Sequence, residues 1–156
     1  MSETHSHKPP QWLSVIGVGE DGLDGLNSTA RSLVAQAEYV FGGARHLALV
    51  APLPQGRCMP WPIPFGAGVE QVLALRGRRV VVLASGDPFF YGVGGVLARS
   101  LGVDEMLCLP APSSVALACA RLGWAQEHCH VVSVCGRPMP RVRPFLQPRE
   151  RLLVLS

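Results

Sequence analysis

The sequence has few of the features that mark membrane, secreted or nucleic-acid-binding proteins. No apolar run reaches the ~20 residues that a membrane-spanning helix needs. The five cysteines are an odd number and include no Cys-x-x-Cys pair, which argues against a disulfide framework and indicates a reducing compartment. The net charge is only +3 and aromatic residues make up 6% of the chain, so a strongly basic surface and an aromatic RNA-binding motif are both missing.

The composition instead indicates a folded domain with a substantial core. Apolar residues make up 48% of the chain, and its length of 156 residues predicts one domain, or one domain and part of another. Residues 1–11 are the exception, because they are polar and lack the apolar core of a signal peptide. We therefore expect a flexible leader at residues 1–11 and a cytoplasmic protein.

Strands and helices are predicted to alternate, because short apolar runs alternate with segments of helical periodicity. This order is typical of α/β folds, in which helices flank a mainly parallel sheet. The expected strands are residues 12–16, 39–41, 58–59, 80–83 and 106–109. The expected helices are residues 28–37 with a cap at Asn27 or Ser28, residues 44–50, 69–75 and 89–100, and a last one that ends at residue 122 after a cap at Ser113 or Ser114.

The pattern changes after residue 126. A strand is expected at 131–135, and the proline-rich residues 138–144 are expected to be irregular. A last apolar strand is expected at 152–155, where it would need partners that the chain does not supply. We therefore expect residues 12–126 to form an N-terminal α/β domain and residues 127–156 to be the truncated beginning of a second α/β domain.

The stretch that follows the strand at 80–83 carries the clearest signal of a site. Ser85 and Gly86 permit a sharp turn. Asp87 stands where a helix N-cap belongs, and Pro88 suits the first helical position. Ligands of open α/β sheets bind at the carboxyl ends of strands. Two interpretations of Asp87 stay open: it holds a hydroxyl or a cation of a ligand, or it only caps its helix.

A second motif gives an alternative function. Gly17-x-Gly19-x-x-Gly22 matches the glycine fingerprint of dinucleotide-binding domains and predicts an oxidoreductase domain for NAD or flavin. Glu38 lies at about the expected distance for the acid that binds the ribose, but it precedes the strand at 39–41 instead of following it. The residues after Gly22 also look more like a loop than a helix N-terminus. The other interpretation is that these glycines only let backbone segments approach closely.

Two polar clusters near the end of the chain are ambiguous. His128, Cys129 and His130 invite a metal interpretation, but a strand would point Cys129 away from both histidines, so we predict no metal site. Five arginines either form a solvated face or clamp the carboxylates of a substrate. They are Arg137, Arg141, Arg143, Arg149 and Arg151.

Three segments together resemble the tetrapyrrole methylases, the S-adenosylmethionine-dependent enzymes of cobalamin and sirohaem synthesis. They are Val-Ile-Gly-Val-Gly at 15–19, Ala-Ser-Gly-Asp-Pro-Phe-Phe-Tyr-Gly at 84–92 and Pro-Ala-Pro-Ser-Ser-Val at 110–115. Four more segments are similar to the N-terminal part of the family's precorrin-6Y C5,15-methyltransferase (decarboxylating) branch. They are residues 40–47, 83–88, 120–124 and 133–138. The resemblance covers residues 12–156.

The resemblance implies a two-domain α/β fold, S-adenosylmethionine as cofactor, and methylation of a precorrin carbon in cobalamin biosynthesis. It also implies a homodimer and, for decarboxylation, a C-terminal methyltransferase module in the same polypeptide or as a partner. The cofactor-binding residues that it implies are Glu20, Ser85, Gly86, Asp87, Phe90, Ser113 and Ser114. The sequence identifies no catalytic base, for which Tyr91, His46 and Glu20 are equal candidates.

Overall fold

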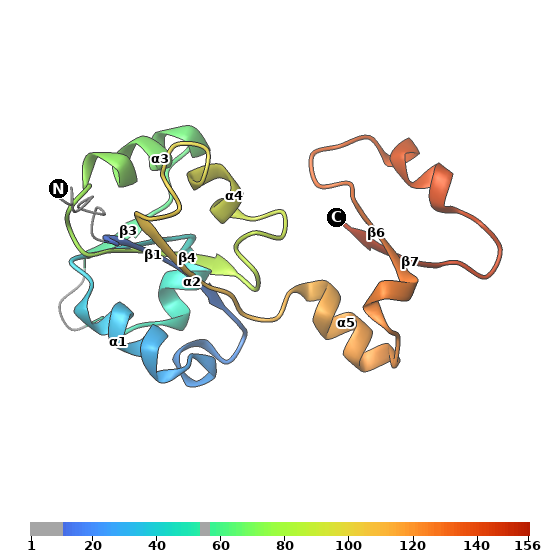
Figure 1. Ribbon diagram of the computed structural model, residues 1–156, viewed down its shortest axis with the longest axis horizontal. Helices are drawn as coiled ribbons and strands as arrows, with labels where there is room; N and C mark the ends of the chain where they lie inside the picture. The colour runs from blue at the N-terminus through green and yellow to red at the C-terminus, as the bar shows by residue number, and fades with distance from the viewer. Residues whose placement is uncertain (1–10, 54–56) are drawn as a thin grey trace, which may run out of the picture. The chain divides into compact units, whose positions relative to one another are not determined.

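The computed structural model describes residues 11–53 and 57–156 (Figure 1). Residues 1–10 of the predicted leader lie outside those ranges. The chain divides into two compact units, one that ends at Ala111 and one that spans Pro112–Ser156, and each is described by itself. In the described residues, no helix combines the length and the apolar character that a membrane crossing requires.

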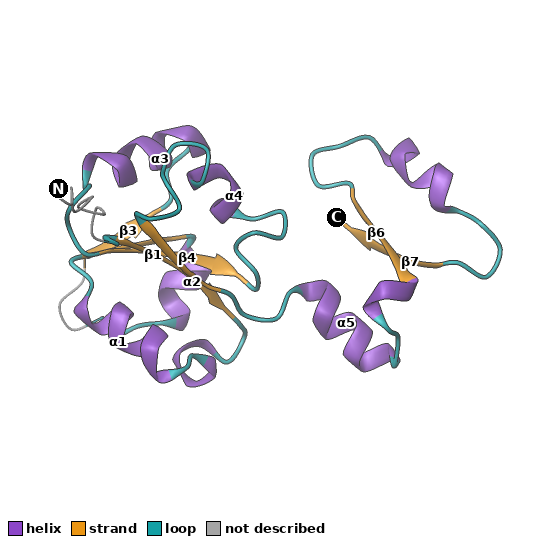
Figure 2. Cartoon of the chain, viewed as in Figure 1, coloured by secondary structure: helices purple, strands orange, loops and turns teal. Residues whose placement is uncertain are grey.

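The first unit is built on a sheet of five parallel strands in the order β3-β2-β4-β1-β5. Figure 2 shows the strands as orange arrows with the helices in purple. The strands are β1 (Leu13–Val18), β2 (Tyr39–Gly42), β3 (Arg57–Pro60), β4 (Val80–Ser85) and β5 (Met106–Leu109). This sheet confirms the predicted α/β class. β1 and β4 extend further than expected, to Val18 and Ser85, because these two residues still pair in register.

Helices cover both faces of this sheet. α1 (Ser28–Gln36) and α2 (Ala44–Leu49) lie on one face, and α3 (Phe65–Ala74) and α4 (Val93–Leu97) lie on the other (Figure 1). α1 begins where predicted, because the Asn27 side chain accepts a hydrogen bond from the Ala30 N–H at 2.8 Å. This contact satisfies one of the main-chain donors that every helix start leaves without a helical partner.

α3 begins at Phe65 and not at residue 69 as predicted. Gly66 and Gly68 in its first turn look like loop residues in the sequence. In the structure, a Cβ at Gly68 would lie 2.6 Å from Cε2 of Trp61, so the glycine lets the helix pack against the tryptophan ring. This is a tertiary contact, and hydrophobic periodicity does not reveal it.

Two apolar clusters fill the space between the sheet and its helices. Val80 and Val82 belong to the cluster under α3 and α4, whereas Val81 and Leu83 belong to the cluster under α1 and α2. All four side chains are buried, so β4 is covered on both faces, as its continuous apolar run predicts. A shift of one residue would exchange the two faces, so this burial fixes the register of β4 and the position of the loop after Ser85.

The second unit contains one α-helix and two paired strands. Its elements are α5 (Ser114–Leu122), η2 (Gln126–His128), β6 (Cys129–Ser133), η3 (Met139–Phe145) and β7 (Arg151–Leu155). β6 and β7 pair in parallel, and β6 starts and ends earlier than the predicted 131–135. The predicted domain boundary after residue 126 falls inside this unit and stays a prediction.

The start and end of α5 agree with the sequence. The Ser113 hydroxyl accepts a hydrogen bond from the Ala116 N–H at 3.1 Å, and Gly123 ends the helix in the left-handed conformation, with φ 64°. The proline-rich segment, in contrast, is more regular than predicted, because residues Met139–Phe145 form a 3-10 helix. Pro140 is tolerated in its first turn, where a main-chain N–H has no helical partner. This helix buries Val142 in a small core of the second unit.

Candidate functional site

The carboxyl ends of β1, β4 and β5 meet at one edge of the sheet, because the three strands are parallel neighbours. Two main-chain hydrogen bonds join the loops at this edge. The Gly86 N–H donates to the Val18 carbonyl at 3.2 Å, and the Gly86 carbonyl accepts from the Ala111 N–H at 3.1 Å. The loop after β4 is therefore fixed to the end of β1 and to the segment after β5, at the edge where such sheets bind ligands.

Gly17 allows these loops to come together. A Cβ at Gly17 would lie 1.8 Å from the Gly86 carbonyl oxygen and 2.5 Å from the Ala111 nitrogen, which leaves no room for any side chain. Gly17 therefore serves close approach of the backbone, which is the simpler of the two interpretations that the sequence left open.

The structure does not support the dinucleotide alternative. The chain after Gly22 forms a 3-10 turn (η1, Gly22–Gly25), and the next α-helix begins only at Ser28, so no helix N-terminus follows the glycines to receive a phosphate. Glu38 precedes β2, at the opposite edge of the sheet from the carboxyl ends, and lies 2.7 Å from an Arg78 nitrogen. An acid that binds a ribose would have to follow β2.

Asp87 does not cap a helix, so the predicted N-cap is wrong. Its Oδ1 accepts a hydrogen bond from the Phe89 N–H at 2.9 Å, and its carbonyl accepts one from the Phe90 N–H at 3.1 Å. These contacts close a turn, and α4 begins later, at Val93, with Gly92 as its N-cap. Aspartate suits such a turn as well as it suits a helix N-cap, which is why the sequence pattern misplaced the helix start.

The carboxylate of Asp87 lies near β5. Burial and, to a smaller extent, the negative charge of Asp87 raise the pKa of the Cys108 thiol on that strand. The side chain of Phe90, in the same loop as Asp87, is half-buried. The centre of its ring lies 4.9 Å from the centre of the Tyr91 ring in an edge-to-face arrangement. Tyr91 has a φ of 54°, which is an energetically unfavourable backbone conformation for tyrosine. The surrounding turn maintains this conformation.

His46 reaches the same edge from α2. Its Nε2 lies 2.7 Å from the Ser85 hydroxyl oxygen, whereas its Nδ1 is buried and has no hydrogen-bond partner within the part of the chain that the structure describes. Burial first, and then the positive charge of Arg45, lower the pKa of the imidazole. His46 is therefore a neutral histidine in contact with a predicted cofactor-binding residue.

Glu20 is paired with Arg45 on the exposed surface beside this site. The hydrogen bond and the charge of Arg45 lower the pKa of Glu20, and the same contact raises the pKa of Arg45. Sequence reasoning did not assign Arg45 to the site. The available signal was its position directly after β2, because parallel strands bring the segments that follow them to one edge.

The remaining predicted residues, Ser113 and Ser114, lie at the start of α5 in the second unit. The Ser113 hydroxyl accepts the capping hydrogen bond and can still donate its own proton. A role for the two serines in the same site as Ser85 and Asp87 stays a prediction.

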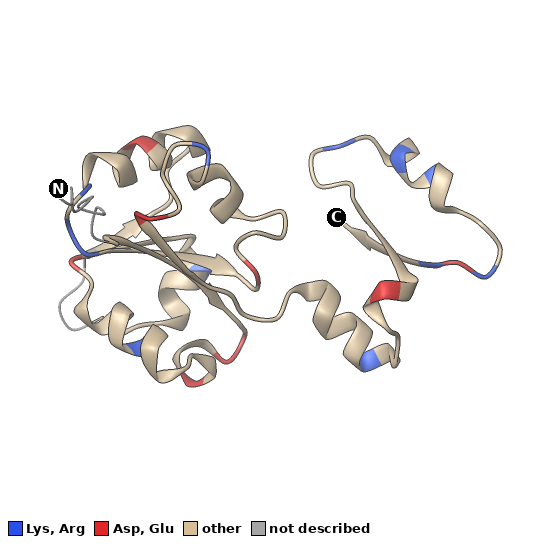
Figure 3. Cartoon of the chain, viewed as in Figure 1, with Lys and Arg blue, Asp and Glu red and all other residues tan. Residues whose placement is uncertain are grey.

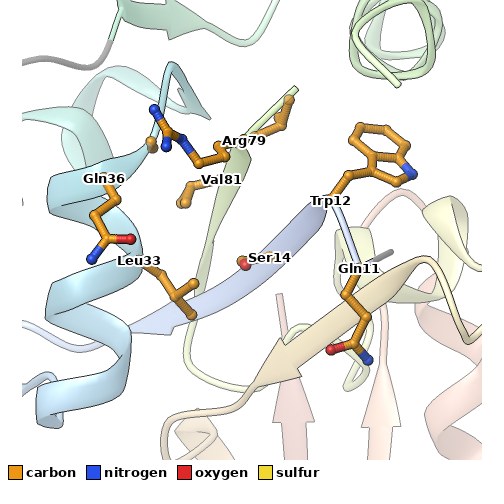
Figure 4. A pocket seen from close by; sticks show the side chains of 9 residues that line it. Gln11, Trp12, Ser14, Leu33, Gln36, Arg79 and Val81 are labelled. Carbon is orange, nitrogen blue, oxygen red and sulfur yellow. The ribbon is translucent and has the colours of Figure 1, made fainter. Parts of the chain in front are cut away.

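A cavity of about 170 Å³ lies at the opposite, amino edge of the sheet (Figure 4). Gln11, Trp12 and Ser14 line it from the start of β1, and Gln36 and Arg79 line it from α1 and from the residue before β4. Because ligands of parallel sheets bind at the carboxyl ends of the strands, this cavity is not the candidate site.

The polar clusters of the second unit have local partners. His130 Nε2 lies 3.1 Å from Glu150 Oε2, and the Arg151 guanidinium lies 5.4 Å from the centre of the Trp124 ring. Basic residues occur on η3 and before β7 (Figure 3). The substrate clamp predicted for the arginines stays a hypothesis.

The chain is similar to named proteins over almost its whole length. Residues 13–154 match the family model of the Tetrapyrrole (Corrin/Porphyrin) Methylases. A relative from a Sinorhizobium species, precorrin-6Y C(5,15)-methyltransferase (decarboxylating), is 52% identical over 145 residues, which are 93% of this chain. The match covers only 35% of that relative, so the chain spans about a third of its length.

Solved structures show the same similarity. The precorrin-6Y methylase of Archaeoglobus fulgidus has a TM-score of 0.72 and 25% identity, and the match covers 94% of this chain and 74% of that one. The uroporphyrin-III C-methyltransferase of Thermus thermophilus, solved in complex with S-adenosyl homocysteine, has a TM-score of 0.66 and 25% identity, with 92% and 69% covered.

Proposed function

The chain belongs to the tetrapyrrole methylase family, and on this basis we propose that it is part of an S-adenosylmethionine-dependent C-methyltransferase. Its substrate is a precorrin of the precorrin-6Y type, and the reaction belongs to cobalamin biosynthesis. The 52% identity to the Sinorhizobium enzyme supports this substrate class. The similarity to a methyltransferase solved with S-adenosyl homocysteine supports the cofactor.

The main structural support for the proposal is the set of chemical groups that the loop at Gly86 offers to a ligand. S-adenosylmethionine has a sulfonium, an ammonium group and ribose hydroxyls, and it has no phosphate. The Asp87 carboxylate and the Ser85 hydroxyl are suitable partners for cationic and hydroxyl groups. Gly86, with φ 57° and no side chain, leaves the main chain open to a ligand. The donor set of this loop therefore fits the cofactor better than it fits a dinucleotide.

The residues of the loop are suited to orienting reactants. The cofactor itself supplies an activated methyl group. The Asp87 turn and the two main-chain hydrogen bonds of Gly86 leave the loop few alternative conformations. Holding two reactants in a productive orientation can lower the activation barrier by about 7–11 kcal/mol. The other residues proposed to bind the cofactor are Glu20, Phe90, Ser113 and Ser114.

We infer that decarboxylation belongs to a further module, in the same polypeptide or in a partner. The chain covers 35% of the Sinorhizobium relative, whose name includes decarboxylation, but 74% of the Archaeoglobus methylase, whose name does not. We also propose that the protein forms a homodimer and that it is located in the cytoplasm. The odd number of cysteines in the sequence and its lack of a Cys-x-x-Cys pair support a reducing compartment.

The test is a calorimetric titration of S-adenosylhomocysteine into wild-type protein and two variants of Asp87. Asp87→Asn keeps an oxygen that can accept from the Phe89 N–H and removes only the charge, whereas Asp87→Ala removes both. We expect saturable binding to the wild type. We expect Asp87→Asn to weaken it by about tenfold or more, because hydrogen bonds to charged groups are the strong ones.

The matched control is Asp24→Asn, since the Asp24 side chain is 96% exposed on η1. Its affinity for S-adenosylhomocysteine should equal that of the wild type. A parallel titration with NAD should give no saturable heat. Binding of NAD, or binding of S-adenosylhomocysteine that is unchanged in both Asp87 variants, contradicts the proposal.

A further inference from the structure

The contact between His46 and Ser85 joins two segments that meet at the candidate site. His46 lies on α2, directly after β2, and Ser85 is the last residue of β4. His46 Nε2 and Ser85 Oγ are 2.7 Å apart. The Ser85 side chain is exposed, so its hydroxyl is accessible to a ligand in the loop.

The surroundings of the imidazole select one of its two neutral tautomers. Nδ1 is buried and unpartnered in the described part of the chain. A buried N–H without an acceptor is rarer and more costly in folded proteins than an acceptor without a donor. The proton therefore sits on Nε2, which donates to Ser85 Oγ. A serine that accepts from a histidine still has its own O–H to donate.

We propose that His46 is a positioning residue: its Nε2–H donates to Ser85 Oγ and directs the Ser85 hydroxyl proton toward a hydrogen-bond acceptor of the bound ligand. The proposal rests on the proposed function, because the ligand is the S-adenosyl cofactor. It adds a residue from outside the loop to the groups that determine the affinity for this cofactor. Such a residue acts through Ser85 and does not need to touch the ligand.

The position of His46 is restricted from several sides. A Cβ at Gly42 would lie 3.3 Å from His46 Cβ, and one at Gly43 would lie 3.4 Å from His46 Nδ1, so the backbone before α2 is close to this side chain. The charge of Arg45 on α2 acts on His46, and Arg45 itself pairs with Glu20, which follows β1. A second proton on His46 would be placed on the unpartnered Nδ1 and near the Arg45 charge, so the neutral form that donates to Ser85 is favoured.

The first experiment measures the tautomer of His46 without any cofactor. Two-bond ¹H–¹⁵N correlation spectra of the ¹⁵N-labelled protein distinguish a protonated Nε2 from a protonated Nδ1, and the His46→Gln variant assigns the signal. We expect the Nε2–H tautomer in the wild type and also in Ser85→Ala, where Nδ1 is still without an acceptor among the described residues, together with a changed Nε2 chemical shift in the variant because the Ser85 partner is lost. A protonated Nδ1, or an Nε2 chemical shift that does not respond to Ser85→Ala, overturns the proposal.

The second experiment measures the affinity for S-adenosylhomocysteine in a double-mutant cycle of His46→Asn and Ser85→Ala. Each single variant should weaken binding by about threefold to tenfold, the value of one hydrogen bond. The double variant should be no weaker than Ser85→Ala alone, because His46 acts only through that hydroxyl. Additive losses overturn the proposal.

Two further variants separate positioning from a structural role. The amide nitrogen of glutamine can reach the place of Nε2, whereas that of asparagine cannot, so His46→Gln should restore affinity to within about twofold of the wild type. His128→Asn, a change of an exposed histidine on η2, is the matched control and should leave the affinity unchanged. If the wild type fails to bind S-adenosylhomocysteine, the proposed function is contradicted, and the tautomer measurement alone then decides the assignment of His46.

Discussion

Gly17 and Gly86 are in such close contact that a methyl group on the first would overlap the carbonyl oxygen of the second, at 1.8 Å. The same oxygen accepts the hydrogen bond from Ala111 that ties the loop after β4 to the segment after β5. The two glycines therefore determine the shape of the candidate site, although neither contributes a side chain to it.

Gly17→Ala should destabilise the protein and impair the site together. The new methyl group meets main-chain atoms that cannot move aside independently, and such overpacking costs about 1–3 kcal/mol. We expect a lower midpoint of urea unfolding and weaker binding of S-adenosylhomocysteine. Gly95→Ala in α4 is the control, because nothing lies within 4 Å of its added Cβ, and a helical alanine should stabilise by about 0.5–1 kcal/mol. Equal stability of the two variants contradicts the close approach at Gly17.

The stability of the protein should depend on pH through His46. Burial and Arg45 lower its pKa from the ordinary value of 6.5, so between the two values the unfolded chain binds more protons than the folded one. The free energy of unfolding therefore rises with pH in this window, and the contribution of His46 is lost as the pH falls through the folded pKa.

Unfolding by urea at several pH values between 5 and 7 measures this effect. The wild type should lose more stability toward pH 5 than His46→Gln, which cannot take up the proton. Other histidines contribute equally to both proteins, and the lowered pKa values of Glu20 and Glu38 act below 4.5. Parallel curves for the two proteins would contradict a lowered pKa at His46.

Among the acidic residues outside the site, Glu105 should cause the largest loss of stability when it is replaced by alanine. Its Oε2 accepts from the Trp12 indole N–H at 3.0 Å and lies 2.8 Å from Arg76 Nε, and the side chain is only 15% exposed. Glu105→Ala leaves the indole N–H without this acceptor and should cost about 1–3 kcal/mol in the free energy of unfolding. Glu70→Ala, an exposed change on α3, should stay within about 0.5 kcal/mol of the wild type.

Asn27→Ala should weaken the start of α1. The variant loses the acceptor for the Ala30 N–H, which is worth about 0.5–2 kcal/mol at a helix N-cap. Asn27→Ser retains such an acceptor and should keep most of the stability. Thermal unfolding of the three proteins checks the order; equal midpoints for the alanine and serine variants would show that the cap contributes nothing.

Local chemistry explains which parts of the fold the sequence predicts. The apolar run of β4 and the caps at Asn27 and Ser113 are decided by neighbouring residues, so they are predictable. The start of α3 depends on the packing of Gly68 against Trp61, which is visible only in three dimensions. Periodicity therefore predicts the elements better than their ends.

The candidate site also has features that the sequence predicts and features that only the structure shows. The sequence points to the loop at Asp87, but it does not distinguish a helix cap from a turn, because the aspartate side chain accepts from main-chain N–H groups in both. The pair of Glu20 and Arg45 and the contact of His46 with Ser85 link residues far apart in the chain. Only the order of the strands brings these residues to one edge.

The hydrogen bonds that Gly86 makes to Val18 and Ala111 use main-chain atoms alone. Mutations that change the side chains of the neighbouring residues therefore leave these two bonds intact. Over evolutionary time, such a loop can exchange the groups that touch its ligand, and so acquire new specificities, while its backbone path is inherited. The position with the least freedom to vary is then Gly17, which has no side chain to offer a ligand.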